Sequence, residues 1–342
     1  MTPFFSICIP NYNYAHYLKE TIDSVLSQDF ENFEIIITDN CSTDGSWELI
    51  QYFKDPRIKA YRNNYNIGFA PNLQACTSKA SGRFIHVLSA DDKMKSNALS
   101  TYANLINLQT QTDNLFLMSD VDYIDENNVI FGIEYRNLET FSSISCVPDK
   151  YKKNPIEFNS NGHNILKSSL PLLKNPAAFL SVMVSSVLWN DVCGYNAVRT
   201  IGPDKFFNYK ILSLNPKVIY VRETLFQYRI HRTANAIAQE NNIKQQIDDY
   251  LNLLEFEKIF KHLDLDYDKA KNVFLNRVCF GYAIRALKKS NIKQAWRLLG
   301  MMLVFPDKAF TNLRFYLLAF LNITYPISTL SIKLIEFIKN KI

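Results

Sequence analysis

The chain has 342 residues, 47% of them hydrophobic and 21% charged, a composition that supports a large buried core and excludes an intrinsically disordered protein. Its length fits one large α/β domain with additions, or two domains. The net charge of +5 suits phosphate-bearing substrates or an anionic membrane surface, and equally an ordinary soluble protein without charged partners. It is too small to indicate a nucleic-acid partner.

Strand and helix signals alternate over the first hundred residues, which is typical of parallel βαβ units. Short apolar runs predict four strands, at Phe4–Ile9, Glu34–Thr38, Ile58–Arg62 and Phe84–Leu88. Helical spacing of apolar residues predicts the helices between them, at Tyr17–Leu26, Ser46–Phe53 and Pro71–Ser78. We therefore expect an α/β fold with a mixed, mostly parallel sheet flanked by helices.

The middle of the chain continues this pattern and then loses it. A helix is predicted at Ser96–Leu108 and a strand at Leu115–Tyr123, whereas the segment 136–178 is polar and weakly periodic, so we expect loops or a lid-like insertion there. Further elements are predicted at Phe179–Leu188, Lys205–Leu214, Val218–Val221 and Tyr228–His231. Beyond about Asn235 the pattern is helical. We predict one domain over residues 1–235 and a C-terminal helical region over 236–342.

The compartment follows from the cysteines and from the absence of targeting signals. Six scattered cysteines form no CxxC pair, which argues against a zinc site and favours a reducing cytosol. The N-terminal segment lacks the basic region of a signal peptide. The best membrane candidate, 313–330, is interrupted by Asn322, Thr324 and Pro326, so we expect a packed or interfacial helix there instead of a membrane span.

Three polar groups fall where predicted strands end: Asn11-Tyr12, Asp39 and Asp91-Asp92. Because ligands of open parallel sheets bind outside the carboxyl ends of the strands, we expect these groups to meet in one cleft.

The pair Asp91-Asp92 can bind a hard cation, which in turn binds a diphosphate. Sites for Mg²⁺ or Mn²⁺ typically use one or two protein carboxylates and complete the shell with substrate phosphates. The structural alternative makes Asp91 a helix N-cap and Asp92 a solvated acid in the first helical turn. Asp39 likewise contacts a ligand or closes its strand as an Asx-turn. Tyr12 either stacks on a base or packs as a loop aromatic.

Two further candidates lie later in the chain. Asp204 precedes a predicted helix and can act as a general base that deprotonates an acceptor hydroxyl, or as the N-cap after Pro203. His231 can ligate a metal through its neutral imidazole, or serve as a satisfied structural side chain.

The ordered series of motifs resembles the family 2 glycosyltransferases, whose domain has the GT-A architecture. The motifs are Ser6–Asn13 (SICIPNYN), Ser24–Gln28, Phe33–Gly45 (FEIIITDNCSTDG), Asn66–Phe69, Gly82–Ile85 and Asp91-Asp92. The resemblance covers roughly residues 4–125 and extends more weakly, through Asp204 and His231, to about residue 235.

The resemblance implies a role for each matching residue. The nucleotide sugar would be contacted by residues of the strand-end motifs, namely Pro10, Asn11, Tyr12, Asp39, Asn66, Gly68 and Asp91. Asp92 and His231 would hold a divalent cation, Mn²⁺ or Mg²⁺. Asp204 stands where inverting members carry their catalytic base. Loops of the 136–178 insertion would then shape the acceptor site.

The implied activity is inverting transfer of a sugar from a nucleotide-diphosphate donor, with UDP as the default nucleotide. The implied acceptor is a glycan or a lipid-linked saccharide, as in bacterial surface polysaccharide (capsule, O-antigen) biosynthesis. Two positions depart from the common pattern: Ser89 stands where many relatives have Asp, and Pro203 where they have an acidic residue. The chain also lacks the Gln-x-x-Arg-Trp motif of processive synthases, so we expect single additions.

The C-terminal region sets basic residues beside an apolar face. Lys288, Lys289, Lys293 and Arg297 accompany Trp296 and several leucines and methionines, a combination suited to an anionic bilayer or to a helical subdomain packed on the catalytic domain. We therefore expect a cytoplasmic protein, either free or peripheral at the inner face of the plasma membrane.

Two other functions fit parts of the sequence. A sugar nucleotidyltransferase shares the βαβ pattern and the metal-binding aspartates, but it usually has a Gly-rich phosphate loop where this chain has Pro10–Asn13. A catalytically inactive module that binds nucleotide sugars or glycans should have lost Asp92 or Asp204, and both are present.

Overall fold

The computed structural model describes residues 2–139, 143–151, 157–195, 203–231 and 243–324. Its strands are β1 (Phe5–Asn11), β2 (Phe33–Asp39), β3 (Ile58–Arg62), β4 (Phe84–Val87), β5 (Lys93–Met94), β6 (Leu115–Ile124), β7 (Ile130–Arg136), β8 (Ser143–Cys146), β9 (Glu157–Asn161), β10 (Met183–Ser185) and β11 (Lys217–Arg229). Over the described residues they form one sheet in the order β3-β2-β1-β4-β10-β6-β11-β5, with β7 and β8 continuing from β6 and with β9 beside β11.

The parallel part of the sheet is the one that the sequence predicts. Strands β3, β2, β1 and β4 are neighbours in parallel register, whereas β10 runs antiparallel between β4 and β6. The apolar runs form strands here because both faces of the sheet are covered, and every residue of β2 is buried. The predicted α/β fold with a mixed sheet is thus confirmed.

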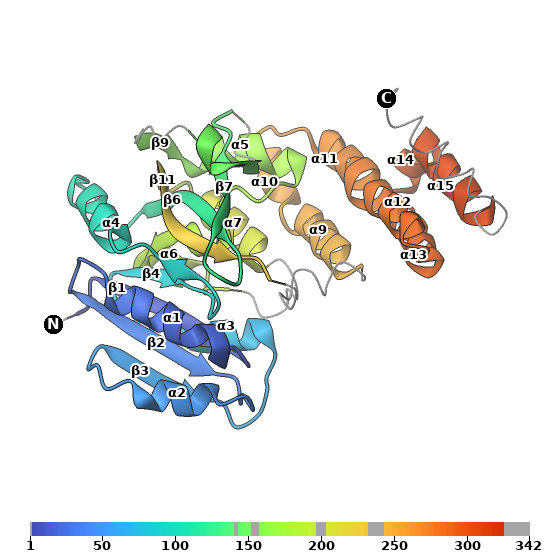
Figure 1. The fold of residues 1–342 in the computed structure, drawn as a ribbon. Helices are drawn as coiled ribbons and strands as arrows, with labels where there is room; N and C mark the ends of the chain where they lie inside the picture. The colour runs from blue at the N-terminus through green and yellow to red at the C-terminus, as the bar shows by residue number, and fades with distance from the viewer. Residues whose placement is uncertain (1, 140–142, 152–156, 196–202, 232–242, 325–342) are drawn as a thin grey trace. The chain divides into compact units, whose positions relative to one another are not determined.

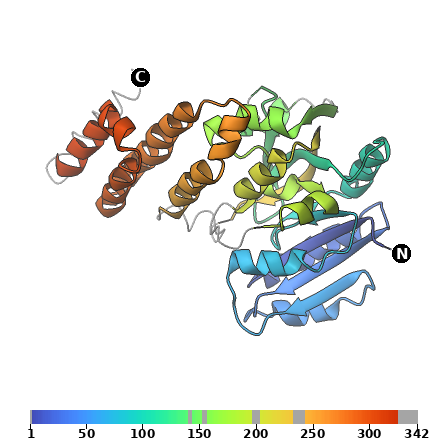
Figure 2. The ribbon, with the colours of Figure 1, turned by 180° about the vertical axis from the view of Figure 1, so that it is seen from behind.

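Helices lie on both faces of this sheet. They are α1 (Ala15–Leu26), α2 (Ser46–Tyr52), α3 (Phe69–Thr77), α4 (Ala98–Asn107), α5 (Gly162–Ser169), α6 (Ser186–Asp191) and α7 (Pro203–Ser213). Figure 1 shows α1 in front of the first strands, and Figure 2 shows α3 on the opposite face, where it packs on β1 and β2. The core joins apolar residues of α1, such as Leu18 and Ile22, to Ile7 and Ile35 of the sheet.

Gly82 allows the turn before β4 to approach β1 closely. A Cβ atom at this position would lie 2.7 Å from the backbone nitrogen of Ser6, a separation that real side chains do not tolerate. The Gly82 N–H instead donates to Ser6 Oγ at 2.8 Å. The glycine of the Gly82–Ile85 motif is therefore required by packing.

The segment 136–178, expected to be loops, contains regular structure. It includes β8, the 3₁₀ turn η1 (Pro148–Lys150), β9, α5 and the 3₁₀ turn η2 (Leu170–Leu172), so the prediction of loops is wrong for these parts. Strand β9 forms because the neighbouring strand β11 supplies its hydrogen-bond partners, and such pairing needs no apolar alternation. The two segments predicted at 218–221 and 228–231 belong largely to one long strand, β11.

A buried carboxylic acid ties this segment to the sheet. Asp120 of β6 accepts hydrogen bonds from the hydroxyls of Tyr151 (2.6 Å) and Tyr220. Burial raises the pKa of Asp120 to about 6, although both tyrosine hydroxyls oppose that rise. The backbone N–H of Arg136 donates to Tyr220 in turn, at 2.9 Å. The insertion is thus fixed to the sheet through polar contacts that no periodicity in the sequence reveals.

The chain divides into two compact units. One contains residues 1–169 and 174–232, and the other contains 170–173 and 233–342. The second unit is helical in its described residues, with α9 (Lys244–Glu255), α10 (Glu257–His262), α11 (Tyr267–Val273), the π-helical segment η5 (Phe274–Phe280), α12 (Gly281–Lys288), α13 (Ile292–Met302), α14 (Pro306–Phe310) and α15 (Leu313–Thr324). Among the described helices, none combines the length and the hydropathy needed to cross a bilayer. Of the segment 313–330, the part beyond Thr324 lies outside the described residues.

Candidate active site

The ends of β1 and β2 form the first part of the candidate site. Asn11 and Asp39 are register partners, and the Asn11 amide donates to Asp39 Oδ1 at 2.9 Å. Asp39 is fully buried, and its Oδ2 accepts from the backbone N–H of Ser42 at 3.0 Å and lies 3.3 Å from Arg62 Nε. Asp39 therefore holds the loop that follows its strand, through a bond three residues along the chain, and lies at the expected sheet edge. Tyr12, which follows β1, is 41% exposed and so is accessible to a ligand.

Asn66 and Gly68 belong to the loop that precedes α3. Asn66 Oδ1 accepts from the amide of Asn40 and from the N–H of Gly68, both at 2.8 Å, so its side chain shapes the loop. Gly68 has φ +91°, a conformation that favours glycine. Asn40, not among the predicted site residues, accepts from Asn63 and from the N–H of Ile67 at 3.0 Å each. It joins the β2 end to the Asn66–Gly68 loop.

The pair Asp91-Asp92 follows β4 and is held from two sides. Thr21 of α1 donates its hydroxyl to the carbonyl of Asp92 at 2.8 Å, and the backbone N–H of Arg229 donates to Asp92 Oδ1 at 2.9 Å. The short strand β5 follows the pair at Lys93, not a helix. The structural alternative for these residues, an N-cap and a solvated first-turn acid, is therefore wrong, and Asp92 is completely buried.

Asp92 has the features of a cation ligand. Its Oδ2 is buried without a hydrogen-bond partner, and burial, together with the charge of Asp91, raises the pKa of its carboxyl well above the usual range. A buried carboxylate oxygen of this kind is costly unless a cation or a proton compensates it. Within the described residues no three His, Cys, Asp or Glu side chains are grouped to enclose a metal. The unpartnered oxygen of Asp92 fits the one or two protein carboxylates with which Mg²⁺ or Mn²⁺ is typically bound.

His231 contacts the other aspartate of the pair. Its Nε2 lies 3.0 Å from Asp91 Oδ2, and its ring packs 5.1 Å from that of Tyr17 and 6.1 Å from that of Tyr14. The structure therefore brings His231 to the acidic pair, with Asp91 as its contact, and its role at a cation stays a prediction.

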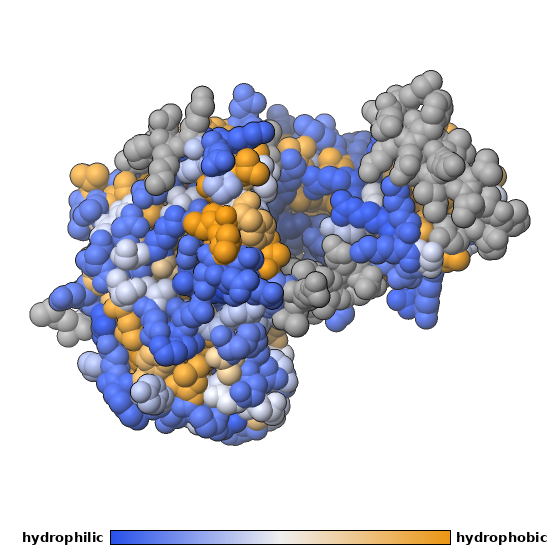
Figure 3. All heavy atoms as spheres, viewed as in Figure 1, coloured by the Kyte–Doolittle hydropathy of each residue, from blue (hydrophilic) through white to orange (hydrophobic). Residues whose placement is uncertain are grey.

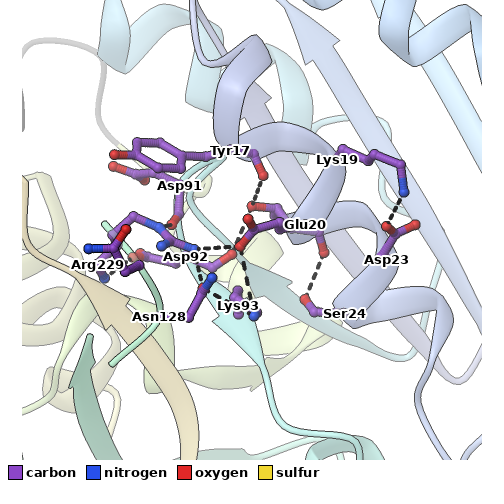
Figure 4. Close-up of polar contacts among 12 residues, drawn as sticks. Tyr17, Lys19, Glu20, Asp23, Ser24, Asp91, Asp92, Lys93, Asn128 and Arg229 are labelled. Atoms are coloured by element: carbon purple, nitrogen blue, oxygen red, sulfur yellow. Dashed lines mark hydrogen bonds and ion pairs between the residues drawn. The ribbon is translucent and has the colours of Figure 1, made fainter. Parts of the chain in front are cut away.

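Arg229 is the main support of the acidic pair, and the sequence gives it no role. Its guanidinium is fully buried and donates from Nε to the carbonyl of Asp91 at 2.9 Å. It also bonds Glu20 at 3.0 Å and Asn128 at 2.9 Å, and it lies 4.5 Å above the ring of Tyr17. Figure 4 shows these side chains converging from α1, the β4 end, the β6–β7 turn and β11. Only the pairing of distant segments could reveal this arrangement.

Asp204 lies in the first turn of α7 and not at the N-cap position before it. The amide of Asn175 donates to Asp204 Oδ2 at 2.6 Å, and the amide of Asn208 donates to Asn175 Oδ1 at 2.8 Å. Burial raises the pKa of Asp204, while the N–H of Lys205, its charge and the Asn175 amide oppose that rise. A raised pKa suits a carboxylate that must accept a proton near neutral pH.

The hydroxyl of Tyr228 responds to the charges of both acidic groups. Burial raises the pKa of its hydroxyl, and the charges of Asp92, Asp91 and Asp204 raise it further. One side chain is thus within electrostatic reach of the acidic pair and of Asp204. Its ring lies 6.0 Å from that of Tyr123. The sequence predicts Tyr228 only as part of the element Tyr228–His231 and gives it no role at the site. Its neighbours, such as Tyr123 of β6, come from distant segments that the sequence does not pair with it.

The β6–β7 turn adds an apolar edge beside this site. Val129, Ile130 and Phe131 are exposed, and the ring of Phe131 stacks 6.2 Å from that of Tyr123. Figure 3 shows apolar atoms gathered on the viewed face where β7 runs. Acidic, aromatic and apolar surfaces therefore adjoin at this end of the sheet.

Solved structures share the fold. TarS of S. aureus in complex with UDP-GlcNAc superposes with a TM-score of 0.61 at 16% identity, over 87% of this chain and 80% of that one. The same protein in complex with UDP gives a TM-score of 0.56 at 18% identity, over 80% and 71% of the two chains. The mixed sheet with its acidic strand end is the GT-A fold of glycosyltransferases.

Sequence comparison supports the resemblance to a known family. Residues 6–162 match the model described as Glycosyl transferase family 2, so the predicted resemblance is confirmed over that part of the chain. The Escherichia coli enzyme WfaP, "UDP-Glc:alpha-D-GlcNAc-diphosphoundecaprenol beta-1,3-glucosyltransferase", is 33% identical over 41% of this chain and 57% of its own length. A Campylobacter jejuni "GalNAc(5)-diNAcBac-PP-undecaprenol beta-1,3-glucosyltransferase" is 27% identical over 78% of this chain and 79% of its own. The match to WfaP thus spans little more than half of that relative.

Proposed function

We propose that the chain transfers a sugar from a nucleoside-diphosphate donor to a saccharide or lipid-linked glycan acceptor, with inversion at the anomeric carbon. The observation that carries the proposal is the buried Asp92, whose Oδ2 lacks a partner, next to Asp91 and its contact His231. The match of residues 6–162 to the model of family 2 glycosyltransferases supports the same reaction class. Residues 1–235 would form the catalytic domain, and residues 236–342 a helical accessory region.

The donor would bind along the strand ends, on Pro10, Asn11, Tyr12, Asp39 and the loop that contains Asn66 and Gly68. Tyr12 is exposed enough to stack on a base. UDP is the first nucleotide to test, because WfaP uses a UDP-sugar by its name and TarS binds UDP and UDP-GlcNAc.

The acceptor would be a sugar on a lipid diphosphate, in the assembly of a bacterial surface polysaccharide. Support comes from the names of WfaP and of the Campylobacter jejuni relative, both of which act on undecaprenol-linked sugars. The apolar β6–β7 turn beside the acidic site is compatible with such an amphipathic substrate. The chain would work in the cytoplasm or at the inner face of the plasma membrane.

In the reaction, Asp204 would accept the proton of the acceptor hydroxyl as that oxygen attacks the anomeric carbon. The bond from that carbon to the donor phosphate oxygen breaks, and the nucleoside diphosphate leaves with the bonding electrons. The Asn175 amide would keep the Asp204 carboxylate oriented and ionised. Arg229 would hold Asp91-Asp92 in place through the Asp91 carbonyl and the Asp92 carboxylate.

A divalent cation, Mn²⁺ or Mg²⁺, would be held by Asp92, with Asp91 and His231 beside it. When bound, such a cation neutralises the charge that develops on the departing diphosphate. The buried, unpartnered Oδ2 of Asp92 fits this ligand role.

The test is product formation from UDP-sugars with and without Mn²⁺. We expect release of UDP by the wild type, and no transfer by Asp204→Asn, which should still bind the donor. Full activity of Asp204→Asn would remove the base role. A nucleotidyltransferase would instead release pyrophosphate from a nucleoside triphosphate and a sugar phosphate, and an inactive module would bind the donor without forming either product.

A further inference from the structure

Helix α15 has a row of exposed apolar side chains along one side, of which Tyr316 also donates its hydroxyl to the carbonyl of Phe310 at 2.9 Å. Its large apolar side chains at positions spaced by three, four and three residues are all more than half exposed: Leu313, Tyr316, Phe320 and Ile323. This spacing places them on one side of the helix, which we name the α15 outer face. Leu318, Leu321 and Asn322 are buried and lie on the other side. The helix is therefore apolar on its exposed side as well as on its buried side.

Such a face is unusual for a surface helix. A surface helix normally sets polar residues opposite its packed side, because exposed apolar area gains nothing in water. Contiguous exposed apolar patches in soluble proteins commonly mark an interaction site. Leu313 is 79% exposed and Ile323 65% exposed, so the α15 outer face can bury substantial area against a partner.

Charge identifies the partner. Residues 285–342 contain ten Lys and Arg but only two Asp and Glu, a net charge of +8, whereas the 284 residues before them carry −3. Among the described residues of this stretch, the side chains of Arg285, Lys288, Lys289, Lys293 and Arg297 are exposed. All of the net positive charge of the chain therefore belongs to the region that contains α15.

The basic residues lie next to aromatic and apolar ones. Helix α13 exposes Trp296 between Lys293 and Arg297, and it packs against α15. Tryptophan and basic side chains on one helix surface, with apolar side chains beside them, are the features by which helices bind the interface of an anionic bilayer. A second copy of the chain is a poor partner for the same region, because two surfaces of high positive charge repel each other.

We infer that the α15 outer face and the exposed basic residues of α12 and α13 form a docking surface for an anionic lipid bilayer. The apolar side chains insert among the lipids, and the basic side chains contact the headgroups. The inference rests on the proposed function in one respect only: a lipid-linked acceptor gives the docking its purpose.

Flotation of the full-length chain with lipid vesicles tests the docking surface. The chain should bind vesicles of phosphatidylcholine and phosphatidylglycerol in equal parts, and should bind pure phosphatidylcholine weakly. Replacing the four residues of the α15 outer face by serine should weaken binding roughly 100-fold, because each side chain loses burial in the lipid. The matched control, Tyr52→Ser with Leu108→Ser, removes side chains that are 75% and 73% exposed in the first unit and should bind as the wild type does.

A second variant tests the charge. Replacing Lys288, Lys289, Lys293 and Arg297 by glutamine should reduce binding to the anionic vesicles at least about tenfold and remove the preference over phosphatidylcholine. Added salt should weaken wild-type binding in the same direction.

Several results would overturn the inference. Unchanged vesicle binding by the serine variant, or an equal loss in its control, would show that the α15 outer face does not dock. A lower melting temperature with unchanged vesicle binding would mean that the chain itself covers this face. A dimer that the serine variant dissociates, without vesicle binding, would make it a self-association surface. UDP release from the donor on transfer to a soluble acceptor is measured separately, so its absence would reject the proposed function and leave the docking result intact.

Discussion

The hydrogen bond from Asn175 to Asp204 gives the sharpest test of the proposed base. The amide N–H donates at 2.6 Å to a carboxylate oxygen, which stabilises the ionised form and opposes the pKa rise that burial causes. In Asn175→Ala that donor is lost, so the pKa of Asp204 rises further. More of the base is then protonated at a given pH, and activity is lost from the acidic side of the pH profile.

The size of the effect follows from the type of bond. A hydrogen bond to a charged group contributes about 1.5–3 kcal/mol, and the partial exposure of Asp204 favours the lower end of that range. Since 1.4 kcal/mol corresponds to about a factor of ten in rate, kcat/KM of Asn175→Ala should fall about tenfold on the acidic limb. It should approach the wild-type value at alkaline pH, where Asp204 is ionised in both proteins.

The assay is kcat/KM for UDP release with saturating acceptor, measured from about pH 5 to about pH 9. Asn208→Ala is the matched control. Asn208 bonds Asn175 at 2.8 Å and not Asp204, so the pKa of Asp204 should rise less in this variant than in Asn175→Ala. A loss of activity that is equal at every pH would assign Asn175 a purely structural role. An unchanged profile would show that Asn175 does not tune the base.

Four other changes probe the site and the fold. Asp92→Asn should abolish Mn²⁺-dependent binding of UDP in calorimetry, because it removes the negative charge of the buried carboxylate whose Oδ2 has no partner. Arg229→Met should lower the free energy of unfolding by about 3–5 kcal/mol in urea titrations, since it removes a buried guanidinium that bonds Glu20, Asn128 and the Asp91 carbonyl and a positive charge near Asp92. Gly82→Ala should cost about 1–3 kcal/mol, because its Cβ meets the β1 backbone. His86→Gln should remove a pH dependence of stability.

The sign of the His86 effect follows from its burial. Burial lowers the pKa of His86 to about 4, so the folded protein keeps the ring neutral while the unfolded chain takes up a proton below its ordinary value of 6.5. Stability is therefore lost as the pH falls from 6.5 toward 4, by at most about 1.4 kcal/mol per pH unit. If the free energy of unfolding of His86→Gln depends on pH as steeply as that of the wild type, another group causes the dependence.

Each of the other three changes has its own counter-evidence. If Mn²⁺ changes the affinity for UDP equally in Asp92→Asn and in the wild type, or changes it in neither, Asp92 does not bind the cation. For Arg229, recovery of stability in Arg229→Lys would show that charge alone suffices, without the fork of donors that Figure 4 shows. A Gly82→Ala protein as stable as the wild type would mean that the turn shifts freely away from β1.

The sequence by itself determines the parallel half of the fold. Apolar runs such as Phe33–Asp39 and the helical spacing of Leu18 and Ile22 are local patterns, and burial on both sides of the sheet follows from them. The strand-end groups Asn11, Asp39 and Asp91-Asp92 could be placed at one sheet edge for the same reason.

Tertiary structure alone decided what surrounds those groups. Arg229, Asn175 and Tyr228 act through contacts with residues many positions away in the chain, and no spacing in the sequence reports such contacts. Strand β9 formed for a similar reason, because β11 offered it hydrogen-bond partners. Local patterns record which face of an element is buried, whereas the pairing of distant segments fixes which side chain meets which.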